Sequence, residues 1–478
     1  MNTVLLVQPP DPPMPVVPLD STYGERVRYV PPWNLQCLRA YLLNKTRHSC
    51  AFIDCRLFSD LEANFVETIR QVAGPPVLVV NTSCAGLGQA IGVIEIAKTN
   101  FPDARIILCG QFPSEFPDKA AQVPHVDFAL AGDPEPILRN VLDSLGISNR
   151  LSRLPGLIHP GSRDNSASWL PDLLGLTLPD WQGIFWPAYE ASPTTTGGRA
   201  KVRLSRGQTG APIDRALGHV HEPFRAWPLA RVAACLQRCA HLGIVEVFVA
   251  DAPGFWTVDR IKAWCTVLRD ERNRQAWAFQ MPPLDLDAET ATLLYSAGCR
   301  RVEILMPSSS PGMLERFGCN TDPGVVDRLV RCFQATGIAP KVCFWLGNPE
   351  EQPGEAKRVI AMIGRLGFCP FSLRAFPFNF DSPFYAEQPR DVEHPTIDTW
   401  LNWARHPWTE EKPLPVWGGA LAQMRTTQAI DAIERAVSKS PTRRLRRMFN
   451  TIRSRNWILE MENAALSFLA QRYPPKNR

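Results

Sequence analysis

The loop RLSRGQTGAPIDR, at residues 203–215, has the chain's most suggestive arrangement of chemically active residues. It follows a short strand pattern, KVRLS at 201–205, and precedes a helical pattern. Strand-to-helix turns of this kind often hold a cofactor in α/β proteins. Arg206 and Gly207 form the turn, yet none of the residues that follow is an obvious ligand. The sequence therefore predicts a binding turn whose ligands are missing.

Two other groups of side chains have the types needed for metal binding. Cys235 and Cys239 are spaced i, i+4 on a predicted helix, but no third ligand follows, so core packing is favoured. His219 and His221, with Glu222 beside them, could bind a divalent metal. Two alternating ligands in a loop are a weak signal, and solvated loop residues are the favoured interpretation.

Composition limits the classes of protein that the chain can be. It has 478 residues, of which 45% are hydrophobic, and a net charge of +5, which is too small to indicate nucleic-acid binding. No apolar run approaches the roughly 20 residues of a membrane span, and no signal peptide opens the chain. The thirteen cysteines are therefore expected to be reduced and mostly buried. We expect a cytoplasmic protein of two or three domains.

The first 147 residues predict one α/β domain. Short apolar runs alternate with helical patterns, which is typical of a parallel sheet covered on both faces. The predicted strands are TVLLVQ (3–8), CAFIDC (50–55), PVLVVN (76–81), RIILC (105–109) and DFALA (127–131). A ligand of such a sheet binds at the carboxyl ends of the strands.

The loops at those ends supply the candidate binding residues. Many of them are small, which lets a large ligand approach the backbone, and Glu135 begins a helix, where a carboxylate is favourable. Ordinary turns are the alternative interpretation for any one loop. The candidates are Pro10, Thr82, Ser83, Gly86, Gly110, Gln111, Phe112, Gly132, Asp133 and Glu135.

A second alternation of strands and helices spans residues 200–385. Six βα units predict a barrel or partial barrel whose site lies at its C-terminal face. The predicted strands are KVRLS, IVEVFVA (244–250), QAWAFQ (275–280), RVEILM (301–306), KVCFWLG (341–347) and SLRAF (372–376). Trp256, Trp277 and Trp345 lie in or near these strands; core packing is the default interpretation and a pocket lining the alternative.

Two further segments complete the expected organisation. Residues 148–199 are rich in Pro, Gly and Ser and predict an irregular linker. Residues 386–478 predict a helical, basic region, in which TRRLRRMFNTIRSRNWILEMENAALSFLA (442–470) partly follows a helical period. A helix packed on the barrel is favoured, and docking to an acidic protein partner or an anionic membrane surface is the alternative.

The order of motifs resembles one known family. PP, PPWNL, NTSC and GQFPSEFPDKAAQVPHVDFALAGDPEPIL follow one another as in the cobalamin-binding domain of cobalamin-dependent radical S-adenosylmethionine enzymes. LTLPDW (176–181) resembles the end of that family's linker, and LGIVEVFVADAPGFWTVDRI, DAETATLLYSAGCRRVEI and TGIAPKVCFWLGNPEEQPGEA resemble its barrel. The resemblance implies a Rossmann-like, flavodoxin-like domain that binds cobalamin, followed by a (β/α)6 partial TIM barrel. Family members bind cobalamin without a His ligand to cobalt, and His125 is expected to be a surface-loop residue.

The chain departs from the family in the loop at 203–215. The family has Ser-Arg-Gly followed by Cys-x-x-x-Cys-x-x-Cys, whose thiolates hold a 4Fe-4S cluster. Aligning Ser205-Arg206-Gly207 puts Gln208, Pro212 and Arg215 at the cysteine positions, and no cysteine lies between Cys109 and Cys235. We therefore expect no cluster and no reductive cleavage of S-adenosylmethionine.

The co-substrate features are also altered, because Pro307 stands where the family's Gly-x-Glu-Ser-Gly has its acid. Binding of S-adenosylmethionine is accordingly in doubt. We expect cobalamin to act directly, as in polar methyl transfer to an unidentified small molecule. The residues expected to line the substrate site are Gln208, Arg215, Asp251 and Gln280. The alternative is a catalytically inactive, cobalamin-loaded partner subunit or sensor.

Overall fold

The computed structural model describes most of the chain up to Phe376 and a short helical stretch within 428–436. The described residues are 3–11, 29–72, 74–84, 86–145, 151, 153–160, 166–179, 181–189, 198–217, 222–322, 324–348, 351, 353–367, 369–376, 428–430, 432–433 and 435–436. The predicted basic helices at 442–470 and the two histidines at 219 and 221 lie outside this part of the chain.

The first 158 residues form a sheet in the order β2-β1-β3-β4-β5-β6, in which all pairs are parallel except β5 with the short edge strand β6. Its strands are β1 (Thr3–Gln8), β2 (Ser49–Asp54), β3 (Val77–Asn81), β4 (Arg105–Cys109), β5 (Phe128–Leu130) and β6 (Leu157–Ile158). The order reverses between β1 and β3, and a ligand site is expected at the carboxyl ends of these strands. The sequence predicted β1 to β5 within a residue or two, whereas two-residue β6 gave no recognisable pattern.

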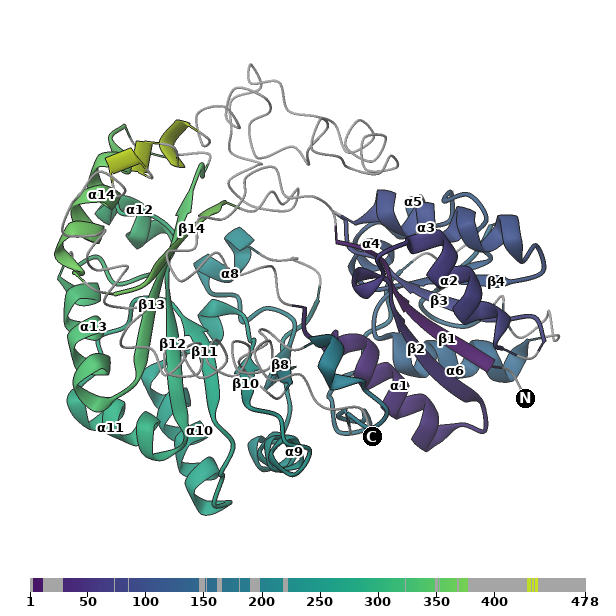
Figure 1. Cartoon of the computed structure of the whole chain (residues 1–478), viewed down its shortest axis with the longest axis horizontal. Coiled ribbons are helices and arrows are strands. Elements are labelled where there is room, and N and C mark those ends of the chain that lie inside the picture. Colours follow the sequence, from purple (N-terminus) through teal and green to yellow (C-terminus); the bar gives the residue numbers. More distant parts are fainter. Residues whose placement is uncertain are drawn as a thin grey trace, which may run out of the picture.

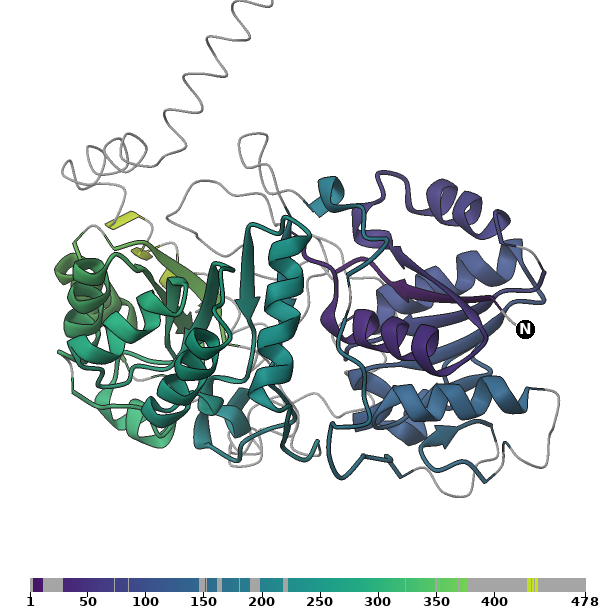
Figure 2. The same ribbon diagram turned by 90° about the horizontal axis from the view of Figure 1, so that it is seen from below.

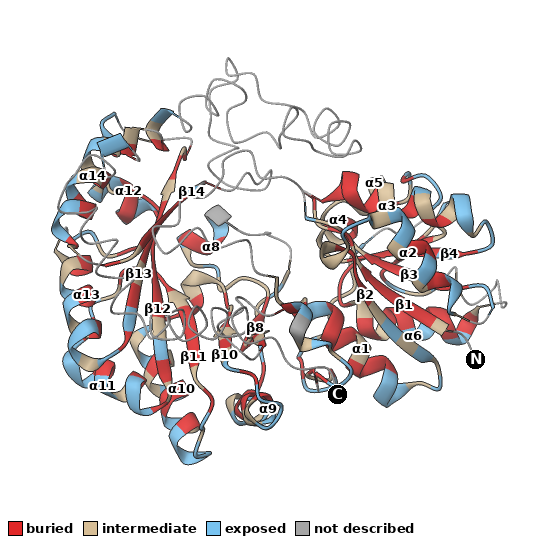
Figure 3. Cartoon of the chain, in the orientation of Figure 1, coloured by how far each residue is buried: buried red, intermediate tan, exposed pale blue. Residues whose placement is uncertain are grey.

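Helices cover both faces of this sheet (Figure 1). They are α1 (Trp33–Lys45), α2 (Leu61–Arg70), α3 (Leu87–Asn100), α4 (Gln111–Glu115), α5 (Pro117–Ala120) and α6 (Pro134–Ser144). Side chains of α1 and α6 share one core with the first face, and side chains of α2 and α3 share another with the second. Strands β1, β3, β4 and β5 are consequently buried on both sides (Figure 3), as their continuous apolar sequences require, whereas residues 49–52 of the edge strand β2 are exposed or half-buried.

The second sheet is wholly parallel, in the order β14-β13-β12-β11-β10-β7. Its strands are β7 (Arg199–Val202), β10 (Glu246–Val249), β11 (Trp277–Met281), β12 (Cys299–Met306), β13 (Ala339–Leu346) and β14 (Phe371–Ala375). The helices between them are α9 (Leu229–His241), α10 (Val258–Asp270), α11 (Ala288–Ser296), α12 (Pro311–Arg316), α13 (Val325–Thr336) and α14 (Glu355–Arg365).

The longer helices of this half lie along one face of the second sheet, and its other face is turned toward the N-terminal sheet (Figures 1 and 2). Their apolar side chains form a single large core with the strands, to which Ile430 and Ile433 also belong. Asp287 and Thr257 accept hydrogen bonds from the first turns of α11 and α10, which fixes where those helices begin.

The predicted strand 201–205 is interrupted in the structure. β7 ends at Val202, and β8 (Ser205–Arg206) turns away to pair antiparallel with β9 (Arg225–Ala226). The backbone N–H groups of Leu204 and Ser205 bond the Asp251 carboxylate instead of a neighbouring strand. A side chain distant in sequence thus ends the strand, which local propensity could not indicate.

The expected mixed α/β fold with parallel sheets is confirmed. In the part of the chain that the structure describes, no helix has both the length and the apolar character needed to cross a membrane.

Candidate functional site: a cavity at the carboxyl edge of the first sheet

A cavity of about 300 Å³ lies where the first sheet meets the second half of the chain. Its floor comes from the ends of β3, β4 and β5 and its sides from α1 and from the loops around β8 and β9. The lining residues are Asn34, Leu35, Leu38, Asn81, Thr82, Ser83, Cys109, Gly110, Gln111, Ser114, Glu115, Gly132, Asp133, Pro134, Trp169, Arg203, Arg206 and Glu222. The location agrees with the rule for parallel sheets, because three successive strand ends supply the floor.

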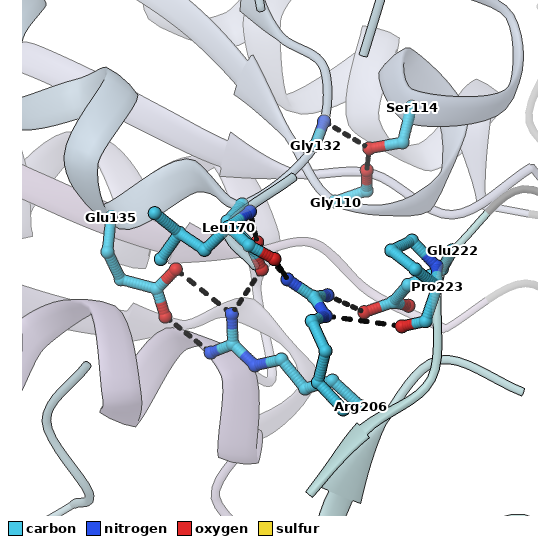
Figure 4. A network of polar contacts seen from close by, with 10 residues as sticks. Gly110, Ser114, Gly132, Glu135, Leu170, Arg206, Glu222 and Pro223 are labelled. Carbon is cyan, nitrogen blue, oxygen red and sulfur yellow. Dashed lines mark hydrogen bonds and ion pairs between the residues drawn. The ribbon is translucent and has the colours of Figure 1, made fainter. Parts of the chain in front are cut away.

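Hydrogen bonds between the loops fix the shape of the floor. Asn81 donates to the side-chain oxygen of Gln8 at 2.8 Å, which joins the ends of β3 and β1. Ser114 donates to the carbonyl of Gly110 at 2.9 Å and accepts from the N–H of Gly132 at 3.0 Å (Figure 4). These bonds hold the loops after β4 and β5 together.

The two floor glycines are required by the packing of the chain itself. Gly110 has φ 104°, and a Cβ there would lie 2.6 Å from Oδ1 of Asn81. Gly132 has φ 107°, and its Cβ would lie 2.0 Å from the carbonyl oxygen of Ser168. Positive φ and close backbone approach both favour glycine. The sequence argument was that small residues leave room for a ligand, whereas the structure explains these two glycines by the packing of the chain itself.

Beside the cavity, Arg206 forms a buried ionic cluster with two acids of the first half. Its guanidinium donates to Asp133 Oδ1 and Glu135 Oε2, each at 3.0 Å, and also to Glu135 Oε1 (Figure 4). Arg206 is 6% exposed, Asp133 1% and Glu135 0%. Burial alone would lower the pKa of Arg206, but Glu135 and the other facing groups raise it well above its ordinary value. Arg206 is therefore charged.

Arg225 completes this cluster from β9. It donates to the second oxygen of Asp133, to the carbonyl of Leu170 at 3.1 Å and to Glu222 at 3.1 Å. Burial raises the pKa of Glu222, although three arginines oppose the shift. The indole of Trp169 lies over the Arg225 guanidinium, 5.4 Å from its carbon. We call Arg206, Arg225, Asp133 and Glu135 the ionic clamp, because it joins the loop after β5 to the β8–β9 ribbon.

The loop that follows Arg206 is closed by Asp214, on the short helix α8 (Pro212–Leu217). Its carboxylate accepts from the hydroxyl of Thr209 at 2.6 Å and from the N–H of Gly254 at 2.7 Å. Asp214 is 1% exposed, and a Cβ on Gly254 would lie 2.8 Å from its Oδ2. The loop at 207–214 is thereby fastened to the segment after β10.

Asp251 holds the segment just before this loop, at Leu204 and Ser205. Its Oδ1 accepts from the N–H of Ser205 at 2.8 Å and from the Ser205 hydroxyl at 2.6 Å, and its Oδ2 accepts from the N–H of Leu204 at 2.9 Å. Burial raises the pKa of Asp251 to about 6, and these hydrogen bonds only partly offset that shift. Asp251 holds β8 in place, which leaves its carboxylate little capacity for a substrate.

The predicted binding residues fall into two sets. Those that line the cavity are Thr82, Ser83, Gly110, Gln111, Gly132 and Asp133. Pro10, Gly86, Phe112 and Glu135 are outside the lining: Phe112 is 1% exposed in the core of the first sheet, and Glu135 faces Arg206. His125 lies in an exposed turn with φ 64°, as expected.

The four predicted substrate residues are dispersed. Arg215 is exposed on α8, Gln280 is half-buried on β11, and Gln208 is half-buried beside Glu222, to whose carbonyl its N–H donates at 3.4 Å. Among the described residues, no hydrogen bond or ion pair joins any two of Gln208, Arg215, Asp251 and Gln280. The side-chain nitrogen of Gln208 is buried and has no partner in the described part of the chain, so it remains available to a ligand.

The other residues that the sequence singled out lie in or against the second core. Cys235 and Cys239 are buried in the second core, as are Trp256 and Trp277, whereas Trp345 is half-buried. Within the described residues, no group of three His, Cys, Asp or Glu side chains is arranged to hold a metal ion.

Several cavity residues lie in motifs that the sequence analysis quoted, or in the linker, but were not predicted to line this site. Asn34, Trp169, Arg203 and Glu222 reach the cavity from a helix, the linker and the second half, not from a strand end of the first sheet. The Arg206 side chain spans 71 residues to Glu135 and 73 to Asp133. The sequence showed two acids at the start of a helix and an arginine beside a glycine in a turn. It did not show that these residues pair.

The fold is similar to that of several solved proteins. Radical S-adenosylmethionine methyltransferase TsrM from Kitasatospora setae, with tryptophan substrate and a SAM analog bound, has a TM-score of 0.64 and 16% identity over 92% of this chain and 89% of that one. The TsrM structure with cobalamin and a 4Fe-4S cluster gives 0.63 and 18%, over 92% and 90%. The cobalamin-dependent S-adenosylmethionine radical enzyme OxsB, with aqua-cobalamin bound, gives 0.59 and 14%, over 91% and 62%.

These structural neighbours are cobalamin-dependent radical S-adenosylmethionine enzymes, which is the resemblance that the sequence motifs predicted. No protein-family model matches the sequence. No curated protein matches it either. At these identities the likeness establishes the fold.

Proposed function

We propose that the chain binds cobalamin in the cavity at the carboxyl edge of a flavodoxin-like domain, which faces a (β/α)6 partial barrel, and that it uses cobalamin for methyl transfer without an iron–sulfur cluster. The observation that carries the proposal is the cavity itself, whose floor comes from the ends of β3, β4 and β5. The TsrM structure with cobalamin bound and the OxsB structure with aqua-cobalamin bound support it through their common fold.

The residues present suit a corrinoid. Its ring is bordered by neutral amide side chains, and the cavity offers neutral donors and acceptors, among them Asn34, Thr82, Ser83 and Gln111. A cavity of about 300 Å³ encloses only part of such a ligand, so the remainder would lie at the open mouth. Among the described lining residues there is no histidine, which fits binding without a protein imidazole on cobalt.

Cobalamin bound there in its methylated form would supply an electrophilic methyl group to a nucleophile. The chain's own part is to bind and orient the reactants and to manage protons. Glu222 lines the cavity with its side chain 29% exposed, and loss of solvent around it raises its pKa. It is therefore the best placed carboxyl to accept a proton from a nucleophile that becomes methylated.

The loop after β8 supports chemistry without a cluster. Gln208, Pro212 and Arg215 occupy the positions at which the family has cysteines, and none supplies a thiolate. Asp214 bonds Thr209 and Gly254 across the loop and so gives it a structure of its own. Anaerobic incubation with iron and sulfide should leave no stoichiometric iron on the full chain; a complete 4Fe-4S cluster would refute this part of the proposal.

One observation favours the alternative of an inactive, cobalamin-loaded partner or sensor. Phe255 and Trp256, on the segment after β10, are 4% and 1% exposed and meet edge to face at 5.1 Å, and Pro307 after β12 is also buried. Buried aromatic packing at these strand ends reduces the room for a substrate there.

Cobalamin binding can be tested with one cavity variant and one matched control. Asn34 is exposed on α1 and lines the cavity, so Asn34→Trp should fill part of it without disturbing the core. Leu43→Trp places the same residue on the exposed side of the same helix. After incubation with hydroxocobalamin and gel filtration, corrin absorbance should remain on the wild type and on Leu43→Trp and fall on Asn34→Trp. A colourless wild-type protein would refute the proposal.

The enzyme and the partner alternatives predict different acceptors, a small molecule or a protein, for the methyl group of bound methylcobalamin. Wild-type protein loaded with methylcobalamin should lose the methyl group when it is mixed with an ultrafiltered small-molecule extract, if it is an enzyme. If demethylation needs a protein fraction instead, the partner alternative is correct. Cobalamin absorbance at the end of each reaction shows that the cofactor stayed bound.

A further inference from the structure

The second half of the chain contributes three residues to the lining of the cavity, and all three have ionisable side chains. They are Arg203, Arg206 and Glu222, whereas most of the lining that comes from the first half and the linker is uncharged. We call these three residues the charged wall. The side of the cavity that belongs to the second half is therefore the side on which charge can select a ligand.

Two residues of the charged wall already have partners of opposite charge. The terminal nitrogens of Arg206 donate to Asp133 and Glu135 in the ionic clamp (Figure 4). Glu222 accepts a hydrogen bond from Arg225 at 3.1 Å. The charges of Arg206 and Glu222 are therefore compensated within the protein.

Arg203 differs, because only one of its three guanidinium nitrogens is bonded. Its side chain is half-buried, and its Nε donates to the carbonyl of Ala250 at 3.1 Å. Among the residues that the structure describes, its two terminal nitrogens have no hydrogen-bond partner, and no carboxylate forms an ion pair with them. The bond at Nε restrains the planar group, and the terminal nitrogens remain as a pair of donors that matches a carboxylate or a phosphate.

Two buried donors on the turn that follows Arg203 also lack partners. Arg206 is 6% exposed and lines the cavity, yet its Nε has no hydrogen-bond partner in the described part of the chain. The same is true of the side-chain nitrogen of Gln208, two residues farther along. Buried polar atoms of folded proteins nearly always have a partner. These donors therefore indicate a ligand that brings acceptor atoms to this part of the cavity.

We propose that the substrate is an organic anion, a carboxylate or a phosphate, and that the terminal nitrogens of Arg203 bind its charged group in the cavity. This inference rests on the proposed function, because it names the class of substrate that would share the cavity with cobalamin. Arg203 takes the role that the sequence assigned to Arg215, which is exposed on α8 and outside the lining. Glu222 belongs to the same wall, so the anion at Arg203 keeps the substrate in the cavity that contains its proposed proton acceptor.

Arg203 and its surroundings set the chemistry of the ligand. A guanidinium with two free nitrogens matches two oxygens of one carboxylate or phosphate. The half-buried ring of Trp169, which lines the same cavity, offers apolar surface to the rest of a small substrate. Benzoate and phenyl phosphate are therefore suitable probes, and benzamide is the neutral control with the shape of the first.

Calorimetric titration of the full chain with these three compounds, with and without bound hydroxocobalamin, tests the need for charge. The wild type should bind at least one anion and give no heat with benzamide. Arg203→Met should weaken anion binding by roughly 10- to 100-fold, as for a lost hydrogen bond to a charged group. Arg203→Lys should weaken it less, because a cation remains, and Arg269→Met, on the exposed side of α10, should leave it unchanged.

Three results of this titration would overturn the inference. They are binding of benzamide as tight as that of the anions, an anion affinity that is unchanged in Arg203→Met, and an absence of binding by either anion. The relative affinity of benzoate and phenyl phosphate in the wild type decides between a carboxylate and a phosphate substrate.

Cobalamin retention separates substrate binding by Arg203 from contact with the cofactor, whose phosphodiester is itself an anion. After gel filtration, Arg203→Met should keep as much corrin absorbance as the wild type, which also shows that its cavity is folded. Loss of the corrin from a variant that melts at the wild-type temperature would assign Arg203 to cobalamin and overturn its role toward the substrate.

A small-molecule extract gives a test that needs no chosen probe. The ultrafiltered extract is divided on an anion-exchange resin at neutral pH, and each desalted fraction is mixed with protein loaded with methylcobalamin. The fraction that the resin retains should demethylate the cofactor, and Arg203→Met should need roughly 10- to 100-fold more of it. Demethylation by the unretained fraction alone would overturn the inference.

Failure of this inference and failure of the proposed function are distinguishable. Corrin absorbance after gel filtration reports cobalamin alone, and the titration without cobalamin reports the anion alone. Anion binding that depends on Arg203, in a protein that does not retain cobalamin, would refute the proposed function and leave the anion site standing. Cobalamin retention without anion binding would do the reverse.

Discussion

Removing one charge from the ionic clamp should destabilise the protein far more than removing a surface charge. In Arg206→Met the side chain keeps its apolar stem and loses the guanidinium. Glu135, which is 0% exposed, then has no cation in hydrogen-bond contact among the described residues, while Asp133 keeps Arg225. The variant therefore leaves one carboxylate buried and unpaired.

The size of the expected loss in the free energy of unfolding follows from the burial of the paired side chains. Breaking a buried pair by removing one member costs about 3–5 kcal/mol, because the remaining charge loses its compensation. Total stabilities are typically about 5–15 kcal/mol, so the loss is a large share. Replacing both members with apolar residues avoids the unpaired charge, and Arg206→Met/Glu135→Leu should recover most of the loss.

Urea titration followed by tryptophan emission measures the free energy of unfolding of each variant. The chain has fourteen tryptophans, so the emission reports unfolding of the whole protein, and Trp227, whose ring lies 5.9 Å from the Arg206 guanidinium carbon, is one contributor. Asp143→Asn is the control, since the Arg139–Asp143 pair is 3.7 Å apart and both side chains are about half exposed. Its loss should stay below about 1 kcal/mol.

Two results would refute this account of the clamp. One is an Arg206→Met loss as small as that of Asp143→Asn, which would mean that water reaches Glu135. The other is a double variant as unstable as the single one, which would assign the loss to packing of the arginine stem and not to the unpaired carboxylate.

Three further predictions concern the residues around the site. Burial raises the pKa of Asp251 from 3.8 to about 6, so the stability that this group contributes is present below pH 3.8 and is lost as the pH rises through about 6. The loss in the free energy of unfolding is about 3 kcal/mol. In Asp251→Asn this change should disappear from the pH dependence of urea unfolding. Gly132→Ala should lower the melting temperature sharply, because the new Cβ meets the Ser168 carbonyl at φ 107°, whereas Gly92→Ala, with open space around it in α3, should be neutral or stabilising by roughly 0.5–1 kcal/mol. Asp214→Ala should cost about 1–3 kcal/mol, since Gly254 and Thr209 lose an acceptor, and should speed hydrogen exchange at the Gly254 amide; exchange at the wild-type rate would contradict this.

The sequence predicted the two sheets well because their strands are continuous apolar runs separated by amphipathic helices. It predicted less well where long-range contacts override local propensity. β8 is the example: KVRLS has a strand pattern throughout, but Asp251, 46 residues farther along the chain, bonds the backbone at Ser205 and ends the strand. Hydrogen bonds of this separation have no periodicity for a local pattern to reveal.

Long-range contacts also explain why the sequence predicted only part of the candidate site. Residues at the strand ends of the first sheet could be named because topology alone brings such ends together, and Thr82, Ser83, Gly110 and Gln111 do line the cavity. The walls come from other elements, such as Asn34 on α1 and Arg203 after β7. Which residues complete a cavity between two halves of a chain depends on how the halves meet, and a single sequence contains no direct sign of that.

The ionic clamp and the contacts of Asp214 together explain how the loop at 207–214 keeps a defined shape without cysteine ligands in it. A bound 4Fe-4S cluster would tie its loop together through three thiolates, and those positions here are Gln208, Pro212 and Arg215. In their place, Arg206 anchors the start of the loop to Asp133 and Glu135, and Asp214 anchors its end to Gly254. Both anchors use buried carboxylates, so each is stable only while its partner is present. The loop at 207–214 therefore depends on the contact between the two halves of the chain, and a variant that breaks the clamp should loosen the cavity wall formed by Arg206 and Glu222 as well.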